Sequence, residues 1–167
     1  MSSSLSLPQA DNSDAAAQYQ EVYATALRLL VRREHSALEL RHKLKARGCP
    51  RALVDQVVIA LTDEGTLSDA RFAEIYTRGR FERGFGRLRI EAELRERGVA
   101  QPLIEVALAD YAAYWQDSAY RQRHKRFGRH APRDFGERAR QMRFLQQRGF
   151  SGEQIRAVLD DAVEADG

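Results

Sequence analysis

The sequence predicts an all-α protein built from three tandem three-helix repeats that form an elongated, curved array. Apolar residues recur at spacings of three and four along most of the chain, which is typical of helices with one buried face. Alternation with period two, which would indicate strands, is nearly absent. A segment Leu-x-x-Arg-Gly occurs three times and ends at Gly48, Gly98 and Gly149, at intervals of 50 and 51 residues. An interval of this size suits a unit of three short helices.

The repeat interval divides the chain into four parts. We expect a disordered N-terminal tail at 1–15 and three-helix repeats at 16–66, 67–116 and 117–167. The tail is rich in Ser, Asn and Asp and has no apolar core, so it does not resemble a secretory signal. The predicted helices are, in order, 16–34, 36–47, 51–63, 68–83, 87–97, 101–114, 117–128, 133–148 and 152–164.

Helix starts and ends carry their own signals. Ser36 with Glu39, and Ser151 with Gln154, fit the capping box, in which two side chains satisfy free amides of the first turn. Three prolines, Pro50, Pro102 and Pro132, lie where helices are expected to begin, because a fixed φ suits the first turn. Each repeat glycine is expected to end a helix in the left-handed region, which residues with a Cβ reach only at a cost.

Composition excludes several classes of protein. The chain has 167 residues, is 43% hydrophobic and carries a net charge of +3, so general disorder is excluded and the protein is only mildly basic. Cys49 is the only cysteine, which excludes an intrachain disulfide and a multi-cysteine zinc site. The longest apolar run, 57–61, is too short to cross a bilayer. We expect a cytoplasmic protein with no membrane partner.

No constellation of residues indicates catalysis. Gly84-Phe85-Gly86 lacks the third glycine or the Gly-Lys-Ser/Thr ending of a phosphate-binding loop, so we interpret it as a turn between helices. The four histidines fit surface or capping positions better than a metal site; they are His35, His42, His124 and His130. We therefore expect no enzyme, no cofactor and no metal.

Basic residues gather in the first and third repeats. Residues 21–66 carry a net +2 and residues 118–167 a net +4, whereas residues 67–117 carry −1. Such clusters bind phosphates, and interleaved aromatic rings stack on bases, but a solvated helix face explains the same pattern equally well. The candidates for contact with DNA or a filament are Arg41, Lys43, Lys45, Arg47, Arg121, Arg123, Lys125, Arg126 and Arg129.

The middle repeat carries a longer motif. It runs Leu67-Ser-Asp-Ala-Arg-Phe-Ala-Glu-Ile-Tyr76 and continues with Arg80, Gly84, Gly86, Arg87, Ile90, Glu93-Leu94 and Gly98. This pattern closely resembles the signature of the RecX family, regulatory proteins of the RecA recombinase, and the similarity covers roughly residues 20–162. The third repeat departs most from it, at Gly136 and Gln141.

The resemblance implies a regulator. Family members look like tandem three-helix repeats that lie along the groove of the RecA filament on single-stranded DNA. They inhibit the ATPase, coprotease and strand-exchange activities of RecA in homologous recombination, DNA repair and the SOS response. Our leading hypothesis is therefore a monomeric negative regulator of RecA. The rivals are a helical-repeat DNA-binding module that acts independently of RecA, and a scaffold for another protein.

The middle motif supplies the candidates for RecA contact, namely Arg71, Tyr76, Arg80 and Arg87. Tyr76 follows Phe72 by four residues and is expected to pack beside it with its hydroxyl free for a partner. Arg80 is a contact candidate that could equally pair with Asp69 or Glu74.

Overall fold

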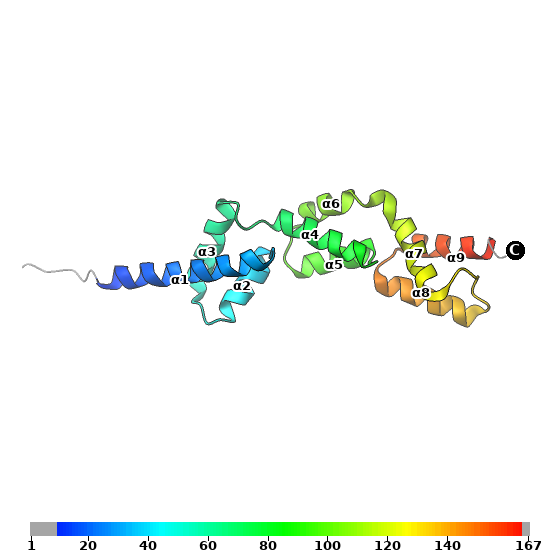
Figure 1. Ribbon diagram of the computed structural model, residues 1–167, viewed down its shortest axis with the longest axis horizontal. Coiled ribbons are helices and arrows are strands. Elements are labelled where there is room, and N and C mark those ends of the chain that lie inside the picture. The colour runs from blue at the N-terminus through cyan, green and yellow to red at the C-terminus, as the bar shows by residue number, and fades with distance from the viewer. Residues whose placement is uncertain (1–9, 165–167) are drawn as a thin grey trace, which may run out of the picture. The chain divides into compact units, whose positions relative to one another are not determined.

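The computed structural model describes residues 10–164, and every regular element in this range is a helix (Figure 1). The first repeat contains α1 (Ala10–Arg32), α2 (Ala37–Lys45) and α3 (Arg51–Asp63), and the second contains α4 (Asp69–Glu82), α5 (Arg87–Glu96) and α6 (Gln101–Ala109). After a short 3-10 turn, η1 (Ala112–Tyr114), the third repeat contains α7 (Trp115–Phe127), α8 (Phe135–Arg148) and α9 (Gly152–Glu164). The predicted all-α tandem repeat is confirmed.

Two helix boundaries differ from the prediction by more than two residues. Helix α1 begins at Ala10 rather than at residue 16, because the polar 11–14 segment leads into three alanines, which are strong helix formers. The predicted tail also includes residues 1–9, which lie outside the described residues. Helix α6 ends at Ala109 rather than at residue 114. The chain turns there so that the ring of Trp115 becomes buried, with its centroid 5.3 Å from that of Phe81.

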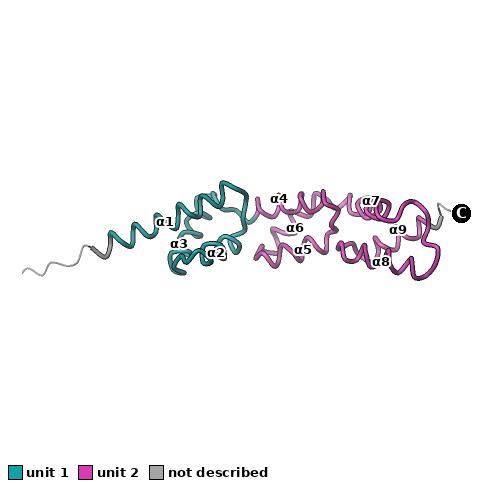
Figure 2. Tube along the Cα trace, turned by 60° about the horizontal axis from the view of Figure 1, so that its bottom comes forward, with its two compact units in different colours: residues 1–69 teal, residues 70–167 magenta. Residues whose placement is uncertain are grey.

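The chain forms two compact units, residues 1–69 and 70–167 (Figure 2). Unit 1 contains the first repeat, in which one face of each helix packs into a single apolar core. Unit 2 contains the second and third repeats, each with a core of its own. The residues buried in the core of unit 1 include Val22, Ala26, Leu40, Leu44, Val54, Val57, Val58 and Leu61.

The repeated Leu-x-x-Arg-Gly segments have the same backbone structure. Each glycine has a positive φ, at 81°, 76° and 89° for Gly48, Gly98 and Gly149. The amide after each glycine donates a hydrogen bond to the carbonyl of the leucine five residues earlier, over 3.1–3.2 Å. This is the Schellman end of a helix, so the predicted glycine caps are confirmed.

The predicted N-caps are present as well. The Ser36 hydroxyl accepts a hydrogen bond from the Glu39 amide at 3.1 Å. Ser151 and Gln154 form the full reciprocal box, because the Gln154 amide donates to the Ser151 hydroxyl and the Ser151 amide donates to the Gln154 side chain. Ser36 and Ser151 are therefore N-cap residues of the helices that follow them, as the sequence indicates.

Within unit 2, the second and third repeats are joined head to tail through their backbones. The Gly86 amide donates to the Arg148 carbonyl at 2.7 Å, and the Leu88 amide donates to the Gly149 carbonyl at 3.0 Å. The first amides of α5 and the last carbonyls of α8 lack partners inside their own helices, so each helix end satisfies the other. Gly84-Phe85-Gly86 is the turn between α4 and α5, as predicted.

Side chains reinforce this joint. The Arg148 guanidinium donates to the carbonyls of Arg83 and Gly84 at 3.0 and 3.2 Å, and the Arg89 guanidinium donates to the Gln147 carbonyl at 2.9 Å. Arg89 and Arg148 also lie over the ring of Phe85. Burial, followed by the neighbouring charge of Arg89, lowers the pKa of Arg148 from its ordinary value. The two repeats therefore form one continuous structure.

Candidate partner-binding surfaces

Two of the predicted RecA-contact residues meet at a half-buried carboxylate. The Tyr76 hydroxyl donates to Glu93 at 2.8 Å, and the Arg80 guanidinium forms a bidentate pair with the same carboxylate, with its Nε donating at 2.6 Å. Arg89 completes the set at 3.0 Å. The expected packing of Tyr76 on Phe72 is confirmed, with ring centroids 5.6 Å apart. The expectation of a free Tyr76 hydroxyl is wrong, because Glu93 on α5 accepts it.

The partner of Arg80 also differs from both acids suggested by the sequence. Asp69 and Glu74 lie on its own helix, whereas Glu93 projects from α5, which packs beside α4. Only 20% of the Arg80 side chain and 14% of the Glu93 side chain are exposed. A pair this sheltered is screened little by solvent, so these groups hold α4 against α5.

We expect Glu93 to make the stability of unit 2 depend on pH. Burial acts to raise the pKa of Glu93, but hydrogen bonds from Arg80, Arg89 and Tyr76 outweigh it and lower the pKa from 4.5 to about 2. The folded pKa lies below the unfolded one, so the stabilisation is complete above pH 4.5 and is lost as the pH falls toward 2. The contribution is about 3 kcal/mol. Urea unfolding of the wild type at pH 5 and at pH 3 should show about 2 kcal/mol of this loss, because the folded carboxylate is still ionised at pH 3.

The matched variants for this measurement are Glu93→Gln and Glu96→Gln. Glu96 is exposed on the same helix. We expect Glu93→Gln to flatten the dependence of unfolding free energy on pH below 4.5, and Glu96→Gln to leave it as in the wild type. An identical pH dependence for all three proteins would contradict the role of Glu93.

The other two predicted contact residues lie elsewhere on the second repeat. Arg87 donates to Glu105 of α6 at 2.6 Å, and its side chain is 37% exposed. Arg71 is exposed and lines a groove of about 210 Å³ between α4 and α6, together with Leu103 and Val106. Val106 is 72% exposed. The lining of this groove therefore combines an exposed apolar side chain with charged groups. We call it the α4–α6 groove.

The predicted basic patch of the first repeat is dispersed around α2. Arg41 is half-buried and pairs with Asp55 of α3 at 3.3 Å, and Lys43 is half-buried. Lys45 and Arg47 are exposed, and Arg47 donates to the Lys43 carbonyl at 3.0 Å. The four residues therefore do not make one surface.

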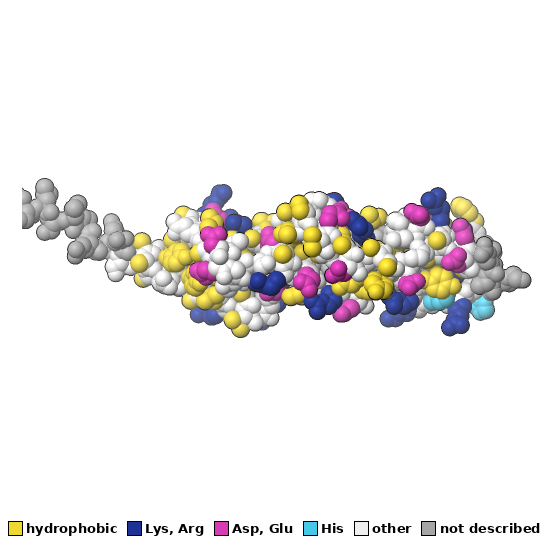
Figure 3. All heavy atoms as spheres, turned by 90° about the horizontal axis from the view of Figure 1, so that it is seen from above, with side chains coloured by type: hydrophobic (Ala, Val, Ile, Leu, Met, Phe, Trp, Pro, Cys, Tyr) yellow, Lys and Arg dark blue, Asp and Glu magenta, His cyan; other side chains and the backbone are white. Residues whose placement is uncertain are grey.

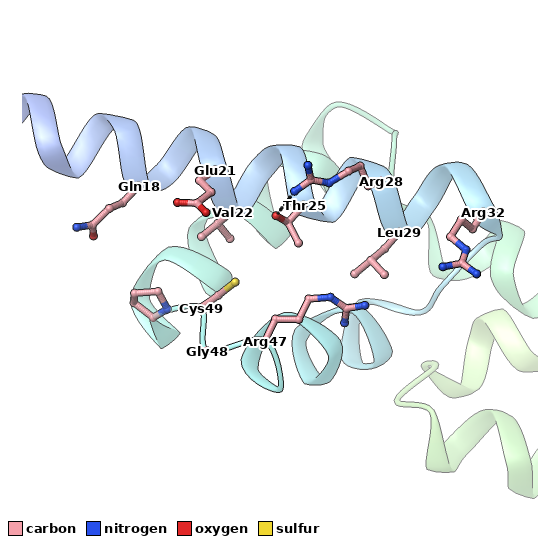
Figure 4. Close-up of a pocket in the computed structure, with 11 residues that line it drawn as sticks. Gln18, Glu21, Val22, Thr25, Arg28, Leu29, Arg32, Arg47, Gly48 and Cys49 are labelled. Atoms are coloured by element: carbon pink, nitrogen blue, oxygen red, sulfur yellow. Dashed lines mark hydrogen bonds between the residues drawn. The ribbon is translucent and has the colours of Figure 1, made fainter.

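Arg47 instead lines a groove of about 750 Å³ in unit 1, between α1 and the turn from α2 to α3 (Figure 4). Arg28 and Arg32, both on α1, also line this groove (Figure 4). Arg28 donates to the Thr25 hydroxyl at 2.8 Å. Val22 and Leu29 from α1 and the half-buried Cys49 supply the apolar part. The groove thus pairs an apolar wall with three guanidinium groups.

One candidate of the third-repeat patch has a different role. Arg123 was expected on a basic surface, but its side chain is fully buried. It donates to Gln141 Oε1 at 2.9 Å and to the carbonyls of Gly128, Arg129 and His130. A guanidinium supplies five donors in one plane, which suits a loop that presents several carbonyls. Arg123 therefore fixes the turn after α7 and is not available to DNA.

Gln141, at which the third repeat departs from the family pattern, is explained by its bond with the buried Arg123. Four residues before the leucine of the repeated segment, the first two repeats have Leu40 and Ile90, which are fully buried. The third repeat has Gln141 at this position, also buried, because its amide oxygen accepts from Arg123. A polar pair thus replaces an apolar contact in this core.

The remaining candidates of the third repeat are exposed: Arg121, Lys125, Arg126 and Arg129. Arg126 lines a pocket of about 210 Å³ together with Phe127 of α7 and with Arg140, Arg143 and Phe144 of α8. In Figure 3, basic side chains lie near histidines toward the C-terminal end of unit 2. Sequence inspection missed Arg140 and Arg143, although their spacing of three places them on one helix face.

The histidines do not form a site with other ligands. Burial, followed by the charge of Arg33, lowers the pKa of His35, whose Nδ1 donates to the Arg33 carbonyl at 2.9 Å. Burial, followed by the charges of Arg123 and Arg129, lowers the pKa of His124. In the described range, no three His, Cys, Asp or Glu side chains converge as metal ligands would.

None of the helices described combines the length and apolar character that a membrane span requires.

Comparisons with known proteins match all three repeats. Family models described as the first, second and third three-helix domains of RecX match residues 23–60, 68–108 and 113–159. The chain is 46% identical over 154 residues to the "Regulatory protein RecX" of Halorhodospira halophila (strain DSM 244 / SL1), covering 92% of this chain and 96% of that protein. It is 43% identical to the protein of that name from Xanthomonas oryzae pv. oryzae (strain MAFF 311018), covering 80% and 83%.

Solved structures agree in fold. The crystal structure of RecX from Lactobacillus salivarius superposes with a TM-score of 0.75 at 19% identity, covering 89% of this chain and 99% of that one. A second crystal structure of a regulatory protein RecX superposes with a TM-score of 0.81 at 20% identity, covering 95% and 81%. With three matching domain models and relatives above 40% identity over most of its length, the chain belongs to the RecX family of regulatory proteins.

Proposed function

We propose that this protein regulates the RecA recombinase. It binds the RecA filament on single-stranded DNA and inhibits the ATPase, coprotease and strand-exchange activities, in the cytoplasm, as a monomer and without catalysis or cofactor of its own. Membership of the RecX family supports the regulatory role. The resemblance described above supplies RecA as the partner and homologous recombination and the SOS response as the setting.

The observation that carries the assignment of a contact surface is the α4–α6 groove. Its exposed Val106 and its arginine, Arg71, combine an apolar anchor with a guanidinium, as the centres of protein interfaces do. Tyr76 and Arg80 are engaged with Glu93 inside the repeat. We therefore assign RecA contact to Arg71 and its groove, and assign Tyr76 and Arg80 the role of positioning α4 on α5.

The hydrogen bonds that join the second and third repeats support the same proposal. A filament presents the same surface at regular intervals, and a protein whose repeats are fixed to one another loses little freedom when both engage it. Several weak contacts then act as one stronger binding event. A deep pocket is not required for such binding.

The test is the rate of ATP hydrolysis by RecA on single-stranded DNA during titration with this protein. We expect hydrolysis to fall at ratios below one molecule per RecA protomer. We expect Val106→Asp to need at least tenfold more protein for the same inhibition, because it places an unpaired charge at the centre of the contact. Unchanged hydrolysis across the full wild-type titration would refute the proposal.

Val31→Asp is the matched control, because Val31 is 87% exposed on α1, outside the α4–α6 groove. It should inhibit like the wild type. Equal loss of inhibition in both variants would show that the α4–α6 groove is not the contact surface. Thermal melting of both variants checks that neither substitution has unfolded the protein.

A further inference from the structure

The third repeat concentrates unpaired positive charge around two aromatic rings. Arg126 lies in the last turn of α7, and Arg140 and Arg143 lie one helical turn apart on α8. All three are exposed, and they line the same pocket of about 210 Å³ with Phe127 and Phe144. We call this pocket the α7–α8 pocket.

The three guanidinium groups make no hydrogen bond or ion pair with any residue that the structure describes. Two other arginines of unit 2 pair with acids. Arg138, on the same helix, pairs with Asp160 at 2.8 Å, and Arg87 pairs with Glu105. Like charges held together without a counter-charge repel, and an anion in the pocket would relieve that repulsion.

The aromatic rings indicate which anion fits. Phe127 and Phe144 are half-buried and meet edge to face, with centroids 5.3 Å apart. Arg148 lies 5.0 Å over the Phe144 ring, so that ring already has a cationic partner. Phe127 has no cation over its ring among the described residues. A base can therefore stack on Phe127 while its phosphates reach the arginines.

The buried Arg123 keeps the pocket in shape. By binding the carbonyls of the 128–130 turn, it fixes the chain directly after Phe127. The exposed Arg129 lies in that turn, two residues after Phe127. A site that is already ordered spends less of its interaction energy on becoming ordered when a ligand binds.

We propose that the α7–α8 pocket binds single-stranded nucleic acid, with Arg126, Arg140 and Arg143 on consecutive phosphates and Phe127 under a base. A duplex presents phosphates but keeps its bases stacked inside, so it uses only half of the site. An acidic peptide also uses the charges and leaves the ring without a partner. The single strand matches both features. This site acts independently of the proposed contact with RecA.

The test measures binding of the full chain to a fluorescently labelled oligothymidylate by anisotropy, without RecA. We expect Arg140→Gln/Arg143→Gln to weaken binding at least tenfold at low salt. We also expect the slope of log K against log salt to become shallower by about 1.4, because each phosphate contact on a single strand contributes about 0.7. The control Arg83→Gln/Arg156→Gln removes the same charge from exposed arginines outside the pocket and should weaken binding less than threefold.

The aromatic contribution is tested separately. Phe127→Leu should weaken binding of the oligothymidylate several-fold without changing the salt slope, whereas Phe127→Trp should preserve binding. Neither should alter the weaker binding of a blunt duplex of the same length. Melting temperatures of the variants confirm that they remain folded, and Phe127→Trp keeps the test valid if Phe127→Leu does not fold.

Three results would overturn the proposal. The first is equal weakening by the two double variants, which would indicate diffuse charge rather than a site. The second is binding of duplex as tight as that of single strand with no effect of Phe127→Leu. The third is displacement of the oligothymidylate by polyglutamate at equal charge concentration, which would favour an acidic peptide. Because RecA is absent from the assay, each of these results would leave the proposed regulation of RecA in place.

Discussion

Replacing Gly86 with alanine is expected to separate the second repeat from the third and to destabilise unit 2 by about 2–4 kcal/mol. Gly86 has a φ of −86°, which alanine adopts without strain. A Cβ at this position would nevertheless overlap the carbonyl group of Gly149 in the neighbouring repeat. The joint would have to open, and the hydrogen bonds from the Gly86 and Leu88 amides would be lost. Urea unfolding measures the loss of stability.

Gly79→Ala is the matched control for this experiment. Gly79 lies inside α4, and a Cβ there would meet no atom within 4 Å. Because alanine favours a helix over glycine by roughly 1 kcal/mol, this variant should be as stable as the wild type or more so. Hydrogen exchange adds a local readout, since Gly86→Ala should expose the Leu88 amide to exchange. If Gly86→Ala has the unfolding free energy of the wild type and the same protection of the Leu88 amide from exchange, the joint does not contribute to stability as we expect.

Replacing Arg123 with leucine is expected to destabilise the third repeat by about 3 kcal/mol. The substitution leaves the buried oxygen of Gln141 without its donor, and it also removes the donors to the carbonyls of the 128–130 turn. A buried acceptor that loses its partner costs about 1–3 kcal/mol. Thermal and urea unfolding measure the effect, and the same variant should loosen the α7–α8 pocket.

The double variant Arg123→Leu/Gln141→Leu tests the reason for this loss. Leu40 and Ile90 occupy the position of Gln141 in the other two repeats, so an apolar residue fits this place in the fold. Replacing both partners removes the unsatisfied oxygen, and we expect the double variant to recover about 1–2 kcal/mol relative to additive effects. Strict additivity of the two single substitutions would show that Arg123 and Gln141 do not act as a pair.

Much of the fold could be predicted because its signals are local. The capping serines, the glycines with positive φ and the apolar spacing act within a few residues, so one segment is enough to recognise them. The exceptions follow the same logic. The break after Ala109 depends on the burial of Trp115 against Phe81, a contact between residues that are far apart in the sequence.

The candidate sites could be predicted less well. An exposed arginine and a buried one look alike in sequence, and the run from Arg121 to Arg129 contains both. Arg123 is distinguished only by the turn that folds back over it. Arg80 and Tyr76 likewise differ from solvent-facing candidates only because both bind Glu93. That residue lies 13 positions beyond Arg80, on another helix.

The sequence by itself determined the helices, their caps and the three repeats, because each rests on periodicity or on residues that interact within one or two turns. The family was indicated by the resemblance of the middle motif to a known signature. The tertiary structure alone decided which charges are available to a partner. It paired Arg80 with Glu93, buried Arg123 beside Gln141, joined the second repeat to the third through Gly86 and Gly149, and brought Arg126 to Arg140 and Arg143. The free energy of a charge depends on its burial and its neighbours, and the packing of helices distant in sequence sets both.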